Sequence, residues 1–181
     1  MRYMFICFAL LASSLAHAEI TGFKDIKFDT TTIEDVVAMG GECHPFEDKS
    51  VLYIYFGTRC SMGSTTVLDV PVDGYTIEFN GDGKITRIKF DSKGSRLRDA
   101  AYQTFTGWKT FSDEKRSNGF MRSETLKSET LNFKNGNRIF LIRSFSTGII
   151  YGVPIITELV GMTFYSKYQS TSREYEKSTD Y

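Results

Sequence analysis

The chain has 181 residues, and its 22 basic and 22 acidic side chains leave no formal net charge. With 41% hydrophobic and 24% charged residues, its composition is that of an ordinary globular protein, which excludes a disordered body. No basic cluster interleaved with aromatic residues forms a nucleic-acid-binding motif, so we expect no nucleic-acid partner.

Residues 1–18 have the pattern of a secretory signal peptide. Arg2 supplies the positive charge, residues 5–15 form the apolar core, and a small-x-small site ends at Ala18. We therefore expect cleavage between Ala18 and Glu19, and a periplasmic or secreted location. The apolar run is shorter than the roughly 20 residues of a membrane span, and Glu19 rather than a cysteine stands directly after the cleavage point, so neither a transmembrane segment nor a lipid anchor is expected.

Cleavage would leave two cysteines, Cys43 and Cys60, and a single histidine, His44. An exported chain enters an oxidising compartment, so we predict a disulfide between Cys43 and Cys60. This bond would close a loop of about 17 residues and stabilise the fold by about 3 kcal/mol. A free pair of thiols, or a zinc site made of both cysteines, the histidine and an acid, is the alternative that the sequence leaves open.

Two segments have helical periodicity. Residues 30–41 predict a short amphipathic helix, because Thr31 and Glu34 can form a capping box and two glycines can end the helix. Residues from 95 onward predict the second helix. Its apolar positions at helical spacing are Leu97, Ala101, Phe105 and Trp108.

The remaining segments predict antiparallel strands. Residues 51–56 are rich in β-branched and aromatic side chains. Residues 75–79 and 84–90 flank the turn NGDG, and Asn135-Gly136 separates two apolar runs, so both turns predict hairpins. NGDG also resembles the start of a calcium loop, but Lys89 occupies the position that requires a bidentate acid, which favours the hairpin.

Three other segments are expected to be extended. They precede the first helix, occupy residues 65–74, and follow residue 148, where Pro154 is best tolerated at a strand edge or bulge. Together the elements predict one α+β domain at residues 19–170, an antiparallel sheet with two helices packed on one face. Residues 171–181 are expected to be a polar tail.

No pattern of catalytic or metal-ligating residues stands out. A serine or cysteine hydrolase would have to use His44 as its base, and neither a Gly-x-Ser-x-Gly motif nor a phosphate-binding glycine loop occurs. We therefore predict no enzyme activity, no cofactor and no metal site. Paired carboxylates that meet only in space, as in a glycosidase, remain the alternative.

One strand-like segment concentrates residue types that are common at binding hot spots, beside the loop that the disulfide would constrain. We predict a protein-binding surface there, formed by Tyr53, Tyr55, Phe56, Arg59 and Met62. Acidic residues prevail in residues 19–83 and basic residues in residues 84–143. The two halves could interleave and neutralise each other, or residues 84–143 could form one basic face.

The segment GFKDIKFDTTTIEDVVAMGG resembles the opening of exported proteins of the outer-membrane assembly lipoprotein (BamE/SmpA) and β-lactamase-inhibitor-protein-like group. A cysteine-bearing segment and a hairpin follow in a similar order, but the lipid-attachment cysteine and a tandem repeat are missing. The resemblance implies a small α+β module used for protein contacts rather than chemistry. The matching positions are Gly22, Ile26, Lys27, Phe28, Thr31, Glu34 and Val36.

We therefore expect an exported protein-binding module, which acts as an envelope assembly factor or as an inhibitor or immunity partner of an exported enzyme. Its partner would be another envelope or exported protein, and the sequence leaves the oligomeric state open. A small cell-envelope hydrolase with paired carboxylates is the alternative function.

Overall fold

The computed structural model describes residues 19–49, 53–117, 122–150 and 153–174. The predicted signal peptide lies outside the described residues, so cleavage after Ala18 stays a prediction. No helix within the described ranges is long and apolar enough to cross a membrane.

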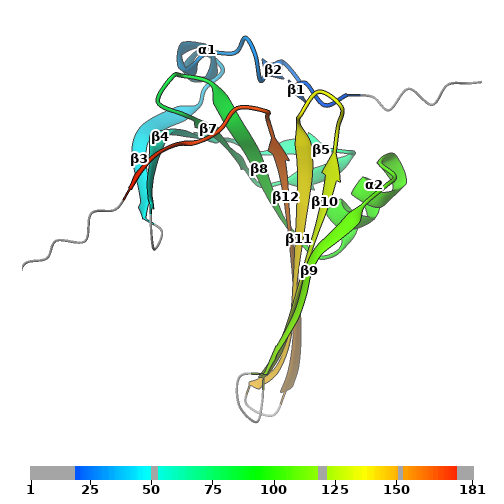
Figure 1. The fold of residues 1–181 in the computed structure, drawn as a ribbon. Helices are drawn as coiled ribbons and strands as arrows, with labels where there is room; N and C mark the ends of the chain where they lie inside the picture. The colour runs from blue at the N-terminus through cyan, green and yellow to red at the C-terminus, as the bar shows by residue number, and fades with distance from the viewer. Residues whose placement is uncertain (1–18, 50–52, 118–121, 151–152, 175–181) are drawn as a thin grey trace, which may run out of the picture.

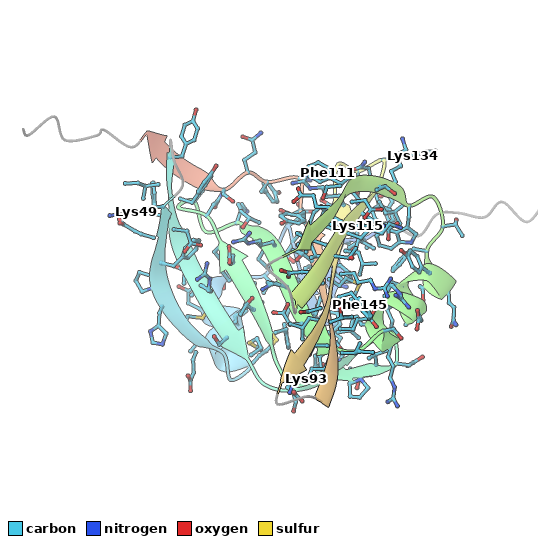
Figure 2. The ribbon with its side chains drawn as sticks, turned by 90° about the horizontal axis from the view of Figure 1, so that it is seen from below. Lys49, Lys93, Phe111, Lys115, Lys134 and Phe145 are labelled. Atoms are coloured by element: carbon cyan, nitrogen blue, oxygen red, sulfur yellow. A yellow bond between two sulfur atoms is a disulfide. The ribbon has the colours of Figure 1, made fainter. Side chains whose placement is uncertain are left out.

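Nine strands of the described chain form one antiparallel sheet (Figure 1). The order across it is β13, β4, β7, β8, β12, β11, β10, β9, and β3 pairs with β4. Seen from below (Figure 2), Lys49 on β3 and Phe111 on β9 lie toward opposite ends of the sheet. The strands are β3 (Glu42–Lys49), β4 (Tyr53–Met62), β7 (Tyr75–Phe79), β8 (Ile85–Lys93), β9 (Lys109–Ser117), β10 (Arg122–Asn132), β11 (Arg138–Ile150), β12 (Val153–Tyr165) and β13 (Thr171–Glu174).

Two helices and two small hairpins cover one face of this sheet. Helix α1 (Ile33–Ala38) contacts β3 and β4, whereas α2 (Arg96–Thr104) contacts β8 and β12. The prediction of a single α+β domain with both helices on one face is therefore confirmed. The hairpins are β1 (Gly22–Phe23) with β2 (Ile26–Lys27) and β5 (Thr65–Val67) with β6 (Val70–Val72).

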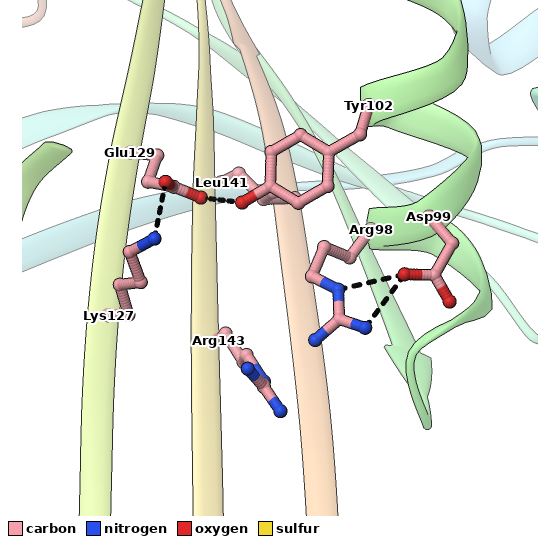
Figure 3. Close-up of a pocket in the computed structure, with 7 residues that line it drawn as sticks. All are labelled: Arg98, Asp99, Tyr102, Lys127, Glu129, Leu141 and Arg143. Atoms are coloured by element: carbon pink, nitrogen blue, oxygen red, sulfur yellow. Dashed lines mark hydrogen bonds and ion pairs between the residues drawn. The ribbon is translucent and has the colours of Figure 1, made fainter. Parts of the chain in front are cut away.

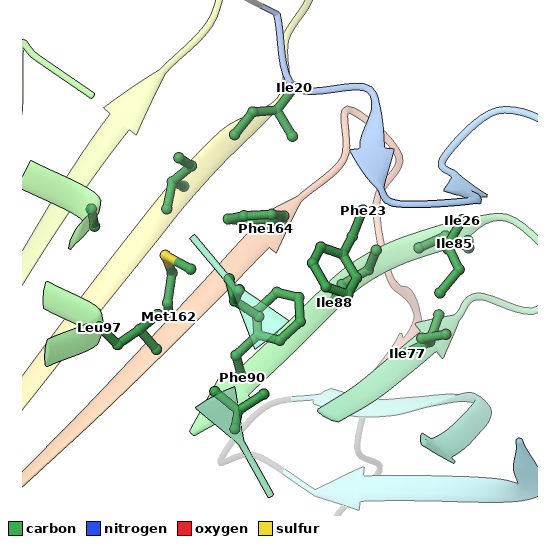
Figure 4. Packing of buried hydrophobic residues seen from close by; sticks show 14 of the residues in the cluster. Ile20, Phe23, Ile26, Ile77, Ile85, Ile88, Phe90, Leu97, Met162 and Phe164 are labelled. Atoms are coloured by element: carbon green, nitrogen blue, oxygen red, sulfur yellow. The ribbon is translucent and has the colours of Figure 1, made fainter. Parts of the chain in front are cut away.

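The hydrophobic core lies between the sheet and this covering layer (Figure 4). Phe90 is at its centre and meets the rings of Phe23 and Phe164 edge to face, with centroids 4.8 and 5.3 Å apart. Such ring pairs add to the free energy gained by burial alone. Val36 of α1 and Leu97 of α2 are fully buried and anchor the two helices on the sheet.

The predicted disulfide between Cys43 and Cys60 is confirmed, with an S–S distance of 2.04 Å. The free thiol pair and the zinc site are thereby excluded. The two cysteines lie directly opposite each other on β3 and β4, so the bond joins two paired strands. Sequence reasoning missed β3, because its exposed charged residues and Pro45 give no alternating pattern.

Helix α1 begins one residue later than its predicted capping box. The N-cap is Thr32, whose hydroxyl accepts a hydrogen bond from the Asp35 N–H at 3.2 Å, while the Asp35 carboxylate accepts one from the Thr32 N–H at 2.9 Å. The predicted box of Thr31 and Glu34 is wrong, because the Thr31 hydroxyl accepts a hydrogen bond from the Lys27 N–H at 2.8 Å instead.

Both predicted hairpins are confirmed. At the turn between β7 and β8, the Asn80 side-chain oxygen accepts hydrogen bonds from the N–H groups of Asp82 and Lys84 at 3.1 and 2.9 Å. This oxygen therefore stabilises the hairpin turn at NGDG, the segment that also resembles the start of a calcium loop. Between β10 and β11, Gly136 adopts the positive φ of 85° that the predicted Asn-Gly turn requires.

Strands β9, β10, β11 and β12 form a long arm, described at residues 109–117, 122–150 and 153–165, that extends beyond α2 (Figure 1). Pro154 pairs with Ile149 of β11, whereas pairing with β8 starts only at Leu159. Pro154 thus lies in a part of β12 that pairs on one side only, as the prediction of a strand edge requires. Strand β9 was not predicted, because charged residues dominate it and its pairing with β10 fixes its conformation.

Two predicted boundaries differ from the structure. Helix α2 ends at Thr104 rather than continuing to Trp108, because Phe105 is extended with φ −124° and ψ 141°. The Trp108 indole N–H then donates to the Phe105 carbonyl at 3.1 Å. At the other end of the chain, residues 171–174 of the predicted polar tail form strand β13 against β4.

Candidate binding site

The face of the sheet opposite the helices is not covered by any other element of the described chain. A buried carboxylate lies on it: Glu78, whose side chain is 6% exposed, accepts hydrogen bonds from Arg59 at 3.0 Å and from Arg87 at 2.6 and 2.9 Å. Burial alone would lower the pKa of Arg87, but its hydrogen bond and attraction to Glu78 raise the pKa overall. We call this side of the sheet the open face.

Strand alternation divides the predicted binding residues between the two faces of β4. Tyr53, Tyr55 and Arg59 lie on the open face, since Arg59 pairs with Glu78 there. Phe56 and Met62 share the opposite face with the buried Cys60, and Met62 packs against the core. The five residues therefore do not form one continuous patch, and a binding role stays a prediction.

Tyr53 and Tyr55 line a hollow of about 700 Å³ on the open face. The opposite wall comes from the turn after β10, the start of β11 and the end of β12 together with the segment that follows it. None of its lining residues has a carboxylate. The lining residues are Tyr53, Tyr55, Thr86, Asn132, Gly136, Arg138, Tyr165, Ser166, Lys167, Tyr168, Gln169 and Ser170. We call this feature the tyrosine hollow.

Arg138 is the cation that β11 contributes to the tyrosine hollow. Its guanidinium lies 4.6 Å from the centroid of the Tyr165 ring, because the two residues are direct cross-strand partners on β11 and β12. Tyr165 is in turn hydrogen bonded to Arg87, and this bond helps to raise the pKa of Arg87. The Tyr165 ring is thereby fixed between two arginines, one at its hydroxyl and one at its face.

The segment of residues 166–170 forms a firmly held rim of the tyrosine hollow. The Lys167 N–H donates to the Asn137 side chain at 2.7 Å, and the Asn80 amide donates to the Gln169 carbonyl at 3.0 Å. The Tyr168 hydroxyl and the Lys167 ammonium contact Asp29 at 2.6 and 3.2 Å. The hydrogen bond from Tyr168, followed by that from Lys167, lowers the pKa of Asp29.

A second, smaller hollow of about 290 Å³ lies under α2 on the covered side of the sheet (Figure 3). Glu129 of β10 accepts hydrogen bonds from the Tyr102 hydroxyl and from Lys127, the latter at 2.7 Å. Glu158 of β12 is paired with Arg98 at 3.1 Å and with Arg143 at 2.7 Å. These contacts tie α2 to the arm through balanced charges.

In this second hollow, the pKa of the tyrosine is raised and the pKa values of the shifted carboxyl groups are lowered. Burial, followed by the hydrogen bond and charge of Glu129, raises the pKa of Tyr102 to about 12. Burial opposes ionisation of Glu129, but hydrogen bonds from Lys127 and Tyr102 lower its pKa overall. A carboxyl general acid needs a raised pKa, whereas every shifted carboxyl pKa in the described chain is lowered. Those carboxyl groups are Asp29, Asp99 and Glu129.

The basic half of the sequence does not gather on one face. Arg87, Lys89 and Arg138 lie on the open face, while Arg98 and Arg143 belong to the charged hollow under α2. His44 is exposed on β3 and pairs across the ladder with Arg59. Among the described residues, no group of His, Cys, Asp or Glu side chains is arranged to hold a metal ion.

Comparisons with protein-family models, with curated proteins and with solved structures give no match for this chain. Its function is therefore argued from the site alone. Sequence reasoning found Tyr53 and Tyr55 but missed Arg138, Tyr165 and Tyr168. The missed residues are more than 80 positions away in the sequence, and only the strand order brings the two groups together.

Proposed function

We propose that the protein is an exported protein-binding module that binds another envelope or exported protein at the tyrosine hollow. The observation that carries this proposal is the lining of the hollow. Four tyrosines, Tyr53, Tyr55, Tyr165 and Tyr168, and Arg138 surround a concave space on a sheet face without a covering layer. Tyrosine and arginine are the residue types enriched at interface hot spots.

The surface beside the hollow supports a protein partner rather than a small ligand. The rings of Phe111, Phe140 and Tyr165 follow one another across the open face, with centroid distances of 5.7 and 6.4 Å. Phe111 is 72% exposed, the largest exposed fraction of any large apolar side chain in the described chain. A partner that fills the hollow and covers these rings would remove that apolar area from water.

The disulfide between Cys43 and Cys60 supports an oxidising, extracytoplasmic location; a periplasmic or secreted location is part of the proposal. Of the two roles considered, envelope assembly factor and inhibitor, we favour the assembly factor. An inhibitor presents a protruding rigid loop to its enzyme, whereas the tyrosine hollow is a concave receptor for a segment of the partner.

Site-specific crosslinking combined with affinity capture tests this function. A photoreactive amino acid at Tyr55 should crosslink one reproducible protein in the native envelope, and the same residue placed at Arg96 should not, because Arg96 is exposed on α2 at the covered side. The double variant Tyr53→Ala/Tyr55→Ala should lose capture of that protein, while Arg96→Ala should retain it.

Equal capture by the tyrosine double variant and the Arg96→Ala control would show that the partner binds elsewhere. Circular dichroism and the thermal midpoint of each variant establish that the fold is intact. If no partner is captured and the purified protein cleaves cell-wall fragments, the binding function is wrong and the hydrolase alternative replaces it.

A further inference from the structure

Arg138 has no carboxylate partner among the described residues, whereas four other arginines of this part of the chain are each paired with a carboxylate. Arg138 is exposed, and the ring of Tyr165 holds its guanidinium at 4.6 Å. Arg96, at the start of α2, is also exposed. Arginines paired with carboxylates are Arg59, Arg87, Arg98 and Arg143.

We propose that Arg138 binds the carboxylate of an aspartate or glutamate side chain in an extended segment of the partner protein. This inference rests on the proposed function and names the chemical feature that the tyrosine hollow recognises. A guanidinium presents a planar fork of N–H donors that matches the two oxygens of a carboxylate. The contact with the Tyr165 ring restricts the position of that fork before the partner arrives, so less entropy is lost on binding.

The charges around the hollow favour a single carboxylate over a polyanion. Lys167 is already paired with Asp29 at 3.2 Å, and Arg87 is paired with Glu78 at 2.6 Å. Neither cation is available without breaking an existing ion pair. Among the residues that line the hollow, Arg138 is the cation without a carboxylate partner, which matches one negative charge, whereas a polyphosphate or an acidic polysaccharide would need several free cations.

The remaining lining residues favour an acidic residue with apolar or aromatic neighbours. Tyr53 and Tyr55 form a tilted ring pair with centroids 6.4 Å apart on the wall provided by β4. Asn132 and Gln169 add neutral amide groups that can bond to the backbone of a bound segment. An acidic side chain would thus reach Arg138 while its neighbours in the sequence contact the tyrosine rings.

A random peptide display library, selected on the disulfide-intact protein, provides the probe. The enriched peptides should share an aspartate or glutamate, and changing that residue to its amide should weaken binding in a fluorescence anisotropy titration. For Arg138→Ala we expect a loss of at least about thirtyfold in affinity, the size found when a desolvated charge pair loses one member. Arg138→Lys keeps the charge but not the fork, and should still lose about tenfold.

Arg96→Ala is the matched control and should bind the peptide as tightly as the unchanged protein. Four results would overturn the inference: enriched peptides without an acidic residue, no enriched peptide, binding by Arg138→Ala within twofold of the unchanged protein, or full recovery in Arg138→Lys. Competition by inorganic phosphate as strong as that by free glutamate would also do so, because it would indicate a general anion site.

The peptide-binding experiment and the crosslinking experiment can succeed or fail independently of each other. If crosslinking through Tyr55 succeeds while the Arg138 variants bind normally, the hollow is the protein-binding site but does not read an acidic residue. If crosslinking fails while the peptide binds with the expected dependence on Arg138, the hollow recognises acidic segments but the envelope partner docks elsewhere.

Discussion

Reduction of the disulfide between Cys43 and Cys60 should lower the free energy of unfolding by an amount that follows from the position of the bond. The two residues are 17 apart in the sequence, so opening the bond returns loop entropy to the unfolded chain. In the chain-entropy model this is worth about 3 kcal/mol, a large share of the roughly 5 to 15 kcal/mol that stabilises a domain. The folded state should change little, because the backbone pairing of β3 with β4 continues along all of β3.

Urea unfolding of the oxidised and the phosphine-reduced protein measures this difference, and the single tryptophan, Trp108, is a suitable fluorescence probe. We expect the free energy of unfolding to fall by about 3 kcal/mol on reduction. The variant Cys43→Ala/Cys60→Ala serves as the control, because its stability must not respond to the phosphine. A loss below about 1 kcal/mol would refute the loop-closure argument, and one well above about 5 kcal/mol would mean that the bond also maintains native packing.

Two further substitutions test local features of the fold. Gly57→Ala should lower the free energy of unfolding in urea by about 1–3 kcal/mol, because the added Cβ would lie 2.0 Å from the Phe79 carbonyl oxygen. Gly63→Ala is the control and should be neutral, because nothing lies within 4 Å of its added Cβ. Equal effects of the two substitutions would contradict this reasoning. Tyr102→Phe should abolish a phenol ionisation near pH 12 in an ultraviolet absorbance titration. The pKa of Tyr102 in the folded protein is raised from 10.0 to about 12. The contribution of Tyr102 to stability is therefore complete below pH 10 and is lost as the pH rises toward 12. The stability of Tyr102→Phe should depend less on pH in that window.

Local chemistry was enough to predict the two hairpins and the disulfide. Asn135-Gly136 and the NGDG turn carry their own backbone requirements, so no distant contact is needed to specify them. The cysteine pair followed from the expected oxidising compartment, and it depended on no strand assignment. The covered face of the sheet was also predictable in outline, since the helical periodicity around Leu97 and Ala101 required an apolar surface to pack against.

Other features depended on contacts outside the segment that carries the pattern. TTTIED offers two overlapping capping boxes, one starting at Thr31 and one at Thr32. The hydrogen bond from the Lys27 N–H to the Thr31 hydroxyl decides between them. This contact belongs to the turn that follows β2, in which the Thr31 N–H donates to the Lys27 carbonyl at 3.0 Å. Strands β3 and β9 likewise take their conformation from β4 and β10, and their own residues are mostly polar.

The candidate site shows the same limit more strongly. Tyr53 and Tyr55 were noticed because their residue types cluster in the sequence, but Phe56 and Met62 cluster equally well and lie on the other face. Residue types that are common at hot spots therefore predict a binding surface only when the strand register shows which of them share a face. Arg138 had no local signal, because an arginine after an Asn-Gly turn is ordinary and its importance comes from Tyr165, its partner across the ladder.

The two faces of the arm also differ in what a partner could cover. On the side of α2, covering the arm would enclose the ion pairs of Glu129 and Glu158, and removing such charges from water costs several kcal/mol for each ion. On the open face, Phe111 and Leu159 are 72% and 49% exposed, and covering them releases apolar area from water. A partner that enters the tyrosine hollow would cover this apolar area by extending along the open face of the arm, past Phe140 to Phe111.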